Sequence, residues 1–175
     1  MIEIQWTVLE HNELPISVKK EIAGLKDQHW KYGMQSQIKW IDENIQPNDL
    51  HLVGRMKNTE DDFLCAYLNM IQVNVLFDEI LYECLGIGNV CVDKRCEHAG
   101  YGIKLIEHAN KILKQKNKQG VLLCKDMLLA FYSKCGWNQI KLAETYVVSE
   151  KYTHKLMVYP EMAQQVKKIK INRNF

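Results

Sequence analysis

The sequence lacks several features that would assign it directly to a class of proteins. It contains no run of about 18 apolar residues, so we expect no transmembrane helix. Its N-terminal segment, MIEIQWTVLE, carries acidic residues and no basic region, which is unlike a signal peptide. The formal net charge is only +2, too small to indicate nucleic acid or a membrane as a partner. These absences favour a cytoplasmic globular protein.

Cysteine is present, but not in the spacing of a metal site. None of the six residues forms a CxxC pair, and most of them lie within apolar runs: Cys65, Cys84, Cys91, Cys96, Cys124 and Cys135. This pattern is typical of reduced, buried thiols in a cytoplasmic protein. We therefore expect no bound metal.

The length and the periodicity of the chain predict one α/β domain. A chain of 175 residues can bury a sizeable core, and a hydrophobic content of 47% with 25% charged residues is usual for a soluble protein. Apolar residues recur at helical spacing in residues 16–30, 34–46, 101–117 and 126–134. Strand-like runs occupy residues 2–9, 50–56, 63–73, 75–92, 120–124, 137–148 and 154–159, and a turn is expected from Asn58 to Asp62. The alternation of strands and helices in the second half requires a partly parallel sheet.

Two glycines mark a junction between a strand and a helix in the stretch CEHAGYGIKL, residues 96–105. Gly100 and Gly102 flank Tyr101, where the helical pattern begins. The first turn of a helix offers free N–H groups and the positive end of the helix dipole, and glycines let a ligand approach the backbone. The pattern fits a phosphate or pyrophosphate site, although a tight turn with close packing would use the same residues. It is not a P-loop, because GxxxxGK[ST] is absent.

A second stretch, LLAFYSKCGW at residues 128–137, gives the pattern a specific resemblance. Val92 stands eight residues before Gly100, and Phe131, Tyr132 and Gly136 follow some 30 residues later. These motifs resemble V-x-x-x-x-[QR]-x-x-G-x-[GA] and FY-x-x-x-G-[FW] of the GNAT N-acetyltransferase superfamily. The resemblance implies the GNAT acyl-CoA N-acyltransferase fold, with a mixed six- or seven-stranded sheet and helices on both faces. It agrees with one domain at residues 1–160. The C-terminal tail at 161–175 is basic, and we expect it to be solvated or frayed.

The resemblance also implies a site for acetyl-CoA as cosubstrate. Four strand residues would pair through their backbone with pantetheine: Asn89, Val90, Cys91 and Val92. The N–H groups of six residues would cradle the pyrophosphate: His98, Ala99, Gly100, Tyr101, Gly102 and Ile103. Glu97 stands where the family usually has Gln or Arg, and its carboxylate would repel the pyrophosphate. Glu97 could point to solvent, Arg95 and Lys94 could supply compensating charge, or acetyl-CoA binding could be weak.

Tyr132 is the general acid that the resemblance implies. A phenol with a pKa near 10 can protonate the departing thiolate of CoA and recover its proton afterwards. The alternative is a core tyrosine that packs beside Leu128 and Phe131.

The general base is less clear from the sequence. The strand positions that hold a base in many relatives are Gly86 and Gly88 here, and such glycines indicate a bulky neighbour or ligand close to the backbone. Glu83 is the candidate base, acting through a water, with Glu79 and the weaker Asp78 as further candidates. A solvated strand edge is the alternative for these carboxylates. An acceptor that arrives neutral would need no strong base.

The acceptor site would be shaped by the segment DQHWKYGMQSQIKW, residues 27–40. Its aromatic and amide side chains suit a sugar or a small polar amine, although the tryptophans could equally close the core. The candidate substrate-binding residues are Trp30, Tyr32, Gln37 and Trp40. His51 and His154 are expected to be structural.

The predicted function is transfer of an acetyl group from acetyl-CoA to a primary amine of a small molecule, such as an amino sugar or aminoglycoside. The amine would attack directly in a ternary complex. The alternative is a non-catalytic acyl-CoA-binding or sensor protein that retains the CoA site. A homodimer is compatible with the resemblance, because many relatives dimerise.

Overall fold

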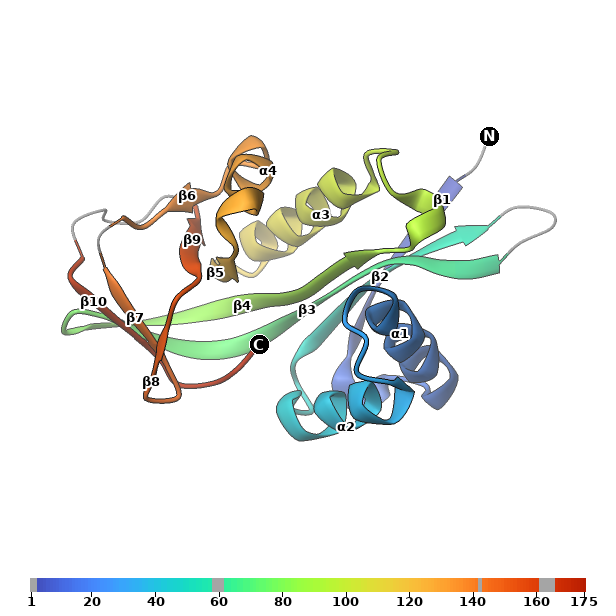
Figure 1. The fold of residues 1–175 in the computed structure, drawn as a ribbon, viewed down its shortest axis with the longest axis horizontal. Helices are drawn as coiled ribbons and strands as arrows, with labels where there is room; N and C mark the ends of the chain where they lie inside the picture. The colour runs from blue at the N-terminus through green and yellow to red at the C-terminus, as the bar shows by residue number, and fades with distance from the viewer. Residues whose placement is uncertain (1–2, 58–61, 142, 161–165) are drawn as a thin grey trace. The chain divides into compact units, whose positions relative to one another are not determined.

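A computed structural model describes residues 3–57, 62–141, 143–160 and 166–175. The predicted turn from Asn58 lies outside these residues. In chain order the helices and strands are β1 (Glu3–Glu10), α1 (Ile16–His29), α2 (Met34–Asn44), β2 (Leu50–Lys57), β3 (Asp62–Phe77), β4 (Ile80–Val92), α3 (Tyr101–Gln115), β5 (Gln119–Cys124), α4 (Leu129–Lys134), β6 (Asn138–Gln139), β7 (Glu144–Val147), β8 (Glu150–Tyr152), β9 (Lys155–Tyr159) and β10 (Lys168–Ile171) (Figure 1). Three short 3₁₀ turns cover His11–Glu13, Lys94–Cys96 and Asp126–Leu128.

Within the described residues, ten strands form one mixed sheet in the order β6-β9-β5-β4-β3-β10-β7-β8, and β2 joins β1 to β3. The pairing of β4 with β5 is parallel, which confirms the prediction of a partly parallel sheet with accompanying helices. The predicted number of six or seven strands is wrong. Strands β6, β8 and β10 contain only two to four residues, too few to give a clear periodic signal.

By its internal contacts the chain divides into two compact units. The first comprises Met1–Ile71 and Asn89–Leu105, and the second comprises Gln72–Gly88 and Ile106–Phe175. The long strands β3 and β4 each contribute residues to both units. The single domain expected over residues 1–160 stays a prediction.

In the first unit, α1 and α2 contact each other and bury one face each. Ile22, Ala23, Leu25 and Lys26 of α1 are buried, as the spacing of a single helical face requires. On α2 the buried residues are Gln37 and Ile41, one helical turn apart. Among the described residues, no helix is long and apolar enough to cross a membrane.

A chain of three polar rings, two of them fully buried, lies in the first unit. The Nδ1 atom of His51 is 2.9 Å from the Tyr67 hydroxyl, and its Nε2 atom is 3.0 Å from Nδ1 of His11. His51 and Tyr67 are both 0% exposed. Burial, with a smaller contribution from His11, lowers the pKa of His51 to about 3. His51 is therefore neutral at pH 7, consistent with the structural role predicted for it.

The core of the second unit is built around Trp137. Its Nε1–H donates to Oδ1 of Asn110 at 2.9 Å, and the Asn110 amide donates to the carbonyl of Cys135 at 2.9 Å. These bonds fasten α3 to the segment that follows α4. Gly120 is required beside them, because a Cβ there would lie 2.6 Å from Leu113 and 2.7 Å from Trp137. All six cysteines of the chain are buried and none is in a disulfide.

The predicted solvated tail is wrong for residues 168–171, which form β10. Ile169 and Ile171 are buried while Lys168 and Lys170 are exposed, the alternation of a strand with one covered face. The strand pairs antiparallel with β3 and parallel with β7. The strand has only four residues, too few for this alternation to stand out in a basic segment of the sequence.

Phe175, beyond β10, packs on β4. A Cβ built on Gly86 would lie 2.6 Å from the Phe175 ring. Gly86 therefore has the bulky neighbour that a glycine in a strand indicates.

The depressed pKa of His51 predicts a loss of stability in weak acid. Above pH 6.5, the pKa of His51 in the unfolded chain, the side chain is neutral in both the folded and the unfolded protein. Between about pH 6.5 and pH 3, His51 binds a proton in the unfolded chain but stays neutral in the folded protein. The free energy of unfolding should fall by about 2 kcal/mol from this group between pH 7 and pH 5. Urea unfolding at both pH values should show a smaller fall in His51→Gln, whereas the exposed His98→Gln should behave as wild type. Equal falls in all three proteins would contradict the assignment.

Candidate active site

The end of β4, predicted to pair with pantetheine, is distorted at Asn89. This residue has φ +52°, a conformation that few residues with a side chain adopt within a strand. Cys91 is buried, and Val90 and Val92 are half-buried. Because β4 continues beyond Asn89 to Val92, the positive φ is a local irregularity within the strand, which is a feature common near functional sites.

The side chain of Asn89 is held by a second asparagine. Its Nδ2 donates to Oδ1 of Asn69 at 2.5 Å. Asn69, on β3, is 0% exposed, and its own Nδ2 is buried without a hydrogen-bond partner in the described part of the chain. Sequence reasoning missed Asn69, because the contact joins positions 20 residues apart.

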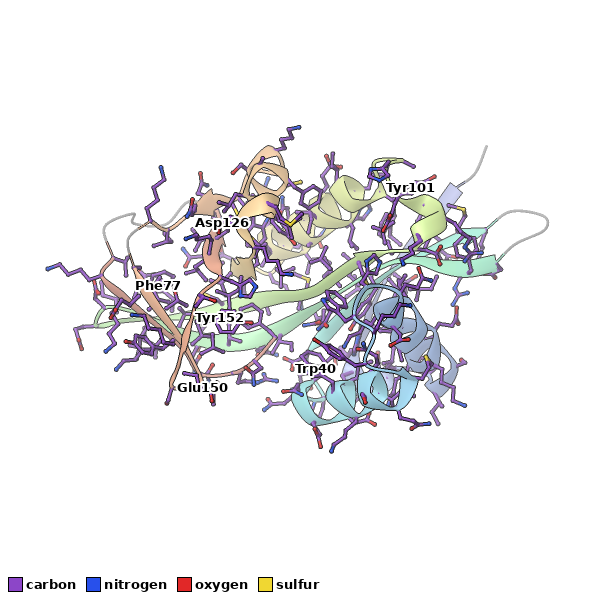
Figure 2. All side chains as sticks on the ribbon, viewed as in Figure 1. Trp40, Phe77, Tyr101, Asp126, Glu150 and Tyr152 are labelled. Carbon is purple, nitrogen blue, oxygen red and sulfur yellow. The ribbon has the colours of Figure 1, made fainter. Side chains whose placement is uncertain are left out.

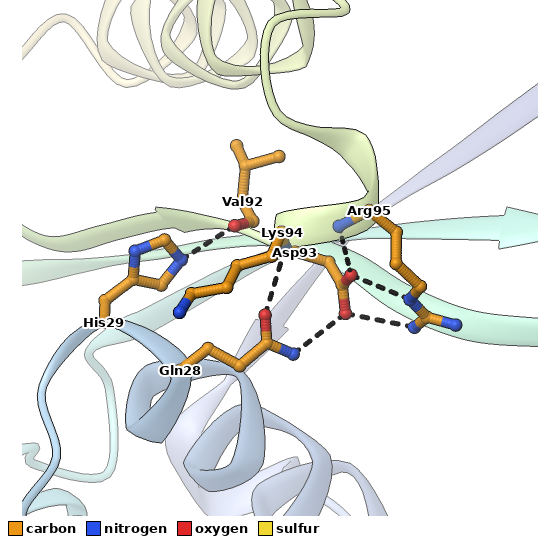
Figure 3. A network of polar contacts seen from close by, with 6 residues as sticks. All are labelled: Gln28, His29, Val92, Asp93, Lys94 and Arg95. Carbon is orange, nitrogen blue, oxygen red and sulfur yellow. Dashed lines mark hydrogen bonds and ion pairs between the residues drawn. The ribbon is translucent and has the colours of Figure 1, made fainter.

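The loop after β4 begins at the buried carboxylate of Asp93 (Figure 3). Oδ1 accepts from the backbone N–H of Arg95 at 2.9 Å and from its Nε at 2.8 Å, and Oδ2 accepts from Nη2 at 3.0 Å. These bonds from Arg95 outweigh the effect of burial and hold the pKa of Asp93 at about 2. The Arg95 guanidinium also lies 3.7 Å from the centre of the Phe63 ring.

Two residues at the end of α1 bind the same segment (Figure 3). Gln28 donates to Asp93 at 3.0 Å and accepts from the N–H of Lys94 at 3.0 Å. The Nε2–H of His29 donates to the carbonyl of Val92 at 2.7 Å. The end of the predicted pantetheine strand is therefore fixed by α1 as well as by its own loop.

The loop then reaches the predicted pyrophosphate site. Gly100 has φ +82°, and no atom lies within 4 Å of the Cβ that a larger residue would carry. Its carbonyl accepts from the N–H of Lys104 at 3.2 Å, and α3 starts at Tyr101 with no acidic residue in its first turn. His98 also has a positive φ, +62°. An open glycine before a helix N-terminus is the geometry that an anion needs.

The remaining predicted residues of this loop lie at its surface. His98, Ala99 and Ile103 are exposed, and Tyr101 and Gly102 are half-buried. Glu97 is exposed too, which agrees with the alternative in which its carboxylate points to solvent. Arg95 is engaged by Asp93, so it is not free to swing toward a ligand without breaking that pair.

Tyr132, the predicted general acid, lies on α4 and is only 6% exposed. Its ring meets Phe131 edge-on with centroids 4.9 Å apart. Burial raises the pKa of the phenol above its usual value, so Tyr132 carries its proton at neutral pH. A proton donor and a core residue both fit these contacts, and the catalytic role stays a prediction.

Each predicted base either has a partner within the protein or is exposed to solvent. Glu83 is exposed and ion-paired with Lys118 at 2.6 Å, a contact that lowers the pKa of the carboxyl. Asp78, in the turn between β3 and β4, accepts from the N–H groups of Lys167 at 3.1 Å and Lys168 at 2.8 Å. Glu79 is exposed in the same turn. The role of Glu83 as a base remains a prediction, and its salt bridge would have to open.

The predicted acceptor residues differ in exposure. Tyr32 is 73% exposed, Gln37 is 3% exposed, and Trp30 and Trp40 are half-buried. Gln37 donates to the carbonyl of Trp30 at 2.7 Å, so its amide already has a structural partner. Figure 2 shows Trp40 on α2.

A buried lysine accompanies this group. The ammonium of Lys26 lies 4.1 Å from the centre of the Trp40 ring, and the residue is 2% exposed. Burial lowers the pKa of Lys26 to about 8. Sequence reasoning missed it, although the spacing of Ile22, Leu25 and Lys26 places the lysine on the apolar face of α1. Among the described residues, no group of three or more His, Cys, Asp or Glu side chains could hold a metal ion.

The comparison of the sequence with protein families decides the assignment. The acetyltransferase (GNAT) domain matches residues 8–140, which is most of the chain. The chain belongs to the GNAT acetyltransferase family. This confirms the family predicted from the two motifs. A comparison with curated proteins gives no match.

Solved GNAT structures share the fold at low sequence identity. ElaA of Escherichia coli is 20% identical, with a TM-score of 0.63 over 89% of this chain and 99% of its own. The GNAT family N-acetyltransferase YhbS of Escherichia coli, in complex with CoA, is 16% identical, with a TM-score of 0.68 over 98% and 91%. An aminoglycoside 6'-N-acetyltransferase complexed with coenzyme A is 12% identical, with a TM-score of 0.59 over 87% and 95%. The predicted GNAT fold is confirmed, and family membership supports acyl transfer from a CoA thioester.

Removing the carboxylate of Asp93 should destabilise the protein. Asp93→Ala leaves the Arg95 and Gln28 donors without their acceptor, so we expect the free energy of unfolding to fall by about 2 kcal/mol at pH 7. Urea unfolding measures the change. Glu97→Ala, which removes an exposed carboxylate from the same loop, is the matched control and should change it by less than about 0.5 kcal/mol. Similar values for the two variants would show that the Asp93 network contributes little.

Proposed function

We propose that this GNAT protein transfers the acetyl group of acetyl-CoA to a primary amine of a small molecule by direct attack in a ternary complex. The observation that carries the proposal is the loop around Gly100, with its positive φ and open space before the first turn of α3, in a chain of this family. The free N–H groups there suit the pyrophosphate of CoA. The N–H groups of residues 98–103 would bind that pyrophosphate.

The strand end would bind the pantetheine arm. The backbone of residues 89–92 would pair with the pantetheine amides. The positive φ of Asn89 supports this, because it departs from the backbone geometry that regular pairing with a neighbouring strand requires. The bonds from Gln28, His29 and Asp93 would keep this segment in place while the ligand enters and leaves. Preorganisation of this kind lowers the cost of ordering the site on binding.

The chemistry needs one proton to be lost and one to be gained. The amine nitrogen attacks the thioester carbon, the carbon–sulfur bond breaks, and the sulfur leaves with the electron pair. Tyr132, protonated at neutral pH, would give its proton to this thiolate and then recover one from solvent, while the acceptor nitrogen would release its own proton to solvent or through Glu83. The balance is one acetylated amine and one free thiol for each turnover.

The acceptor would be a small polar amine. Trp30, Tyr32 and Trp40 offer stacking surface, which suits an amino sugar or an aminoglycoside. The solved aminoglycoside 6'-N-acetyltransferase with a related fold is compatible with this class. A CoA-release assay with a panel of amines tests the proposal. Tight CoA binding with no turnover on any amine would favour an acyl-CoA-binding or sensor protein instead.

Substitution of Gly100 should abolish CoA binding. In Gly100→Val a β-branched side chain would fill the open space and resist the positive φ. Calorimetric titration with CoA should show at least about a 100-fold loss of affinity, since several N–H contacts are lost together. Gly33→Val is the matched control, because Gly33 has φ +84° and equally open surroundings before α2. Both folded variants binding CoA as wild type would show that Gly100 serves only the turn.

Removing the Tyr132 hydroxyl should slow the chemical step. Tyr132→Phe keeps the ring in the core, so we expect kcat to fall by about 100- to 10,000-fold with acetyl-CoA affinity almost unchanged. Steady-state kinetics and calorimetry separate the two effects. Tyr152→Phe, on the exposed strand β8, should leave kcat as in wild type. An unchanged kcat in Tyr132→Phe would remove this phenol from the reaction.

A further inference from the structure

Asn69 carries a hydrogen-bond donor that makes no contact with an acceptor in the described part of the chain. The residue is 0% exposed, and its Nδ2 has no partner among the described residues. A buried amide N–H without an acceptor loses its hydration and gains nothing in return, so such groups are rare in folded proteins. A donor kept in this state needs an explanation beyond packing.

The neighbours of Asn69 leave its amide nitrogen without an acceptor. Its Oδ1 already accepts from Asn89, so the nitrogen is the atom of this amide that lacks a partner. His51 is the residue opposite Asn69 on β2, but its two ring nitrogens face His11 and Tyr67. Neither neighbour therefore supplies the acceptor that the Asn69 amide lacks.

The position of Asn89 shows which part of a ligand would lie closest. The expected pyrophosphate loop, residues 98–103, follows the C-terminal end of β4. A pantetheine arm that runs from this loop along the strand passes Val92 first and reaches Asn89 last. The acyl end of acetyl-CoA would therefore lie next to Asn89, and so next to the amide that Asn89 holds.

We propose that the Nδ2–H of Asn69 donates a hydrogen bond to the thioester carbonyl oxygen of bound acetyl-CoA. This inference rests on the proposed function and adds a catalytic residue to it. Two separate irregularities, the unused donor and the positive φ of Asn89, meet at this one point.

The hydrogen bond would stabilise the negative charge that develops on the thioester oxygen during the reaction. When the amine attacks, the carbon–oxygen double bond opens and negative charge collects on the oxygen. A neutral amide donor stabilises that charge without giving up its proton, and the charge returns when the carbon–sulfur bond breaks. Asn69 would thus bind the carbonyl in the ground state and bind it more strongly in the transition state.

Two CoA derivatives separate this role from general CoA binding. Acetyl-CoA carries the carbonyl, whereas S-ethyl-CoA has nearly the same size and lacks it. We expect the wild-type protein to bind acetyl-CoA roughly tenfold more tightly in calorimetric titrations, the size of one good hydrogen bond. In Asn69→Leu, a substitution of similar volume without a donor, the two affinities should become equal through weaker binding of acetyl-CoA alone.

Controls distinguish a functional amide from a structural one. Asn74→Leu makes the same substitution at an exposed position of β3 and should keep the wild-type preference. Without ligand, Asn69→Leu removes an unsatisfied buried donor but also the acceptor of Asn89, so these opposing effects should leave its melting temperature close to that of wild type. If Asn69→Leu does not fold, Asn89→Gly is the second variant: glycine accepts the positive φ, the clamp on Asn69 is lost, and the preference should shrink.

The outcomes divide cleanly. Equal affinities in the wild-type protein, or an equal loss of both affinities in Asn69→Leu, would overturn the role of Asn69 and leave the CoA site intact. A lower melting temperature of unliganded Asn69→Leu with an unchanged preference would show a structural amide. If wild-type protein binds neither derivative, the proposed function itself fails, and this inference fails with it.

Discussion

The carboxylate of Asp93 holds together the part of the chain on which the CoA site would depend. The carboxylate accepts hydrogen bonds from Arg95 and from Gln28, while the backbone N–H of Asp93 donates to the carbonyl of Cys65 at 2.8 Å. The buried anion therefore joins the end of β4, the following 3₁₀ turn and the end of α1, and the backbone of the same residue joins the neighbouring strand β3. Because every partner of the carboxylate is a donor, the ionised form is favoured, and the pKa of about 2 follows from that arrangement. The loop that leads to α3 begins at this junction.

Three of the four positive-φ residues described in the first unit lie near the same junction, and the fourth is Gly33 before α2. Asn89, His98 and Gly100 all have positive φ, and they lie within twelve residues of one another along the chain. Such conformations persist where the surrounding contacts determine them, and they are frequent at binding sites. Here the contacts are visible: Asn69 holds the side chain of Asn89, and the carbonyl of Gly100 begins the hydrogen bonding of α3. Hydrogen bonds therefore hold the segments in which these positive φ angles occur.

Long periodic segments were predictable from the sequence. Short strands, and contacts that depend on how two strands pair, were not. The helix predicted at residues 16–30 is α1 (Ile16–His29), and the strand predicted at 120–124 is β5 (Gln119–Cys124). The break predicted after residue 73 was wrong, because β3 continues to Phe77 and the turn falls at Asp78. In the candidate site, the loop around Gly100 could be predicted from its residue types alone. The pairing of Asn69 with Asn89 depends on two strands meeting in one register, and no local pattern records it.

The missing base has a physical explanation within the proposed function. Gly86, one of the two glycines at the strand positions expected to hold a Glu or His base, is covered by Phe175, and Glu83 is paired with Lys118. Without a strong base, the reaction needs an acceptor that loses its proton on entering the site. A desolvated surface and a nearby cation both favour the neutral form of an amine. In the segment predicted to receive the acceptor, Trp40 lies against the ammonium of the buried Lys26, and burial lowers the pKa of that amine to about 8. The shift of Lys26 shows what desolvation does to an amine in this part of the protein. An acceptor amine desolvated to a similar degree on binding would move toward the neutral, nucleophilic state without a carboxylate to deprotonate it.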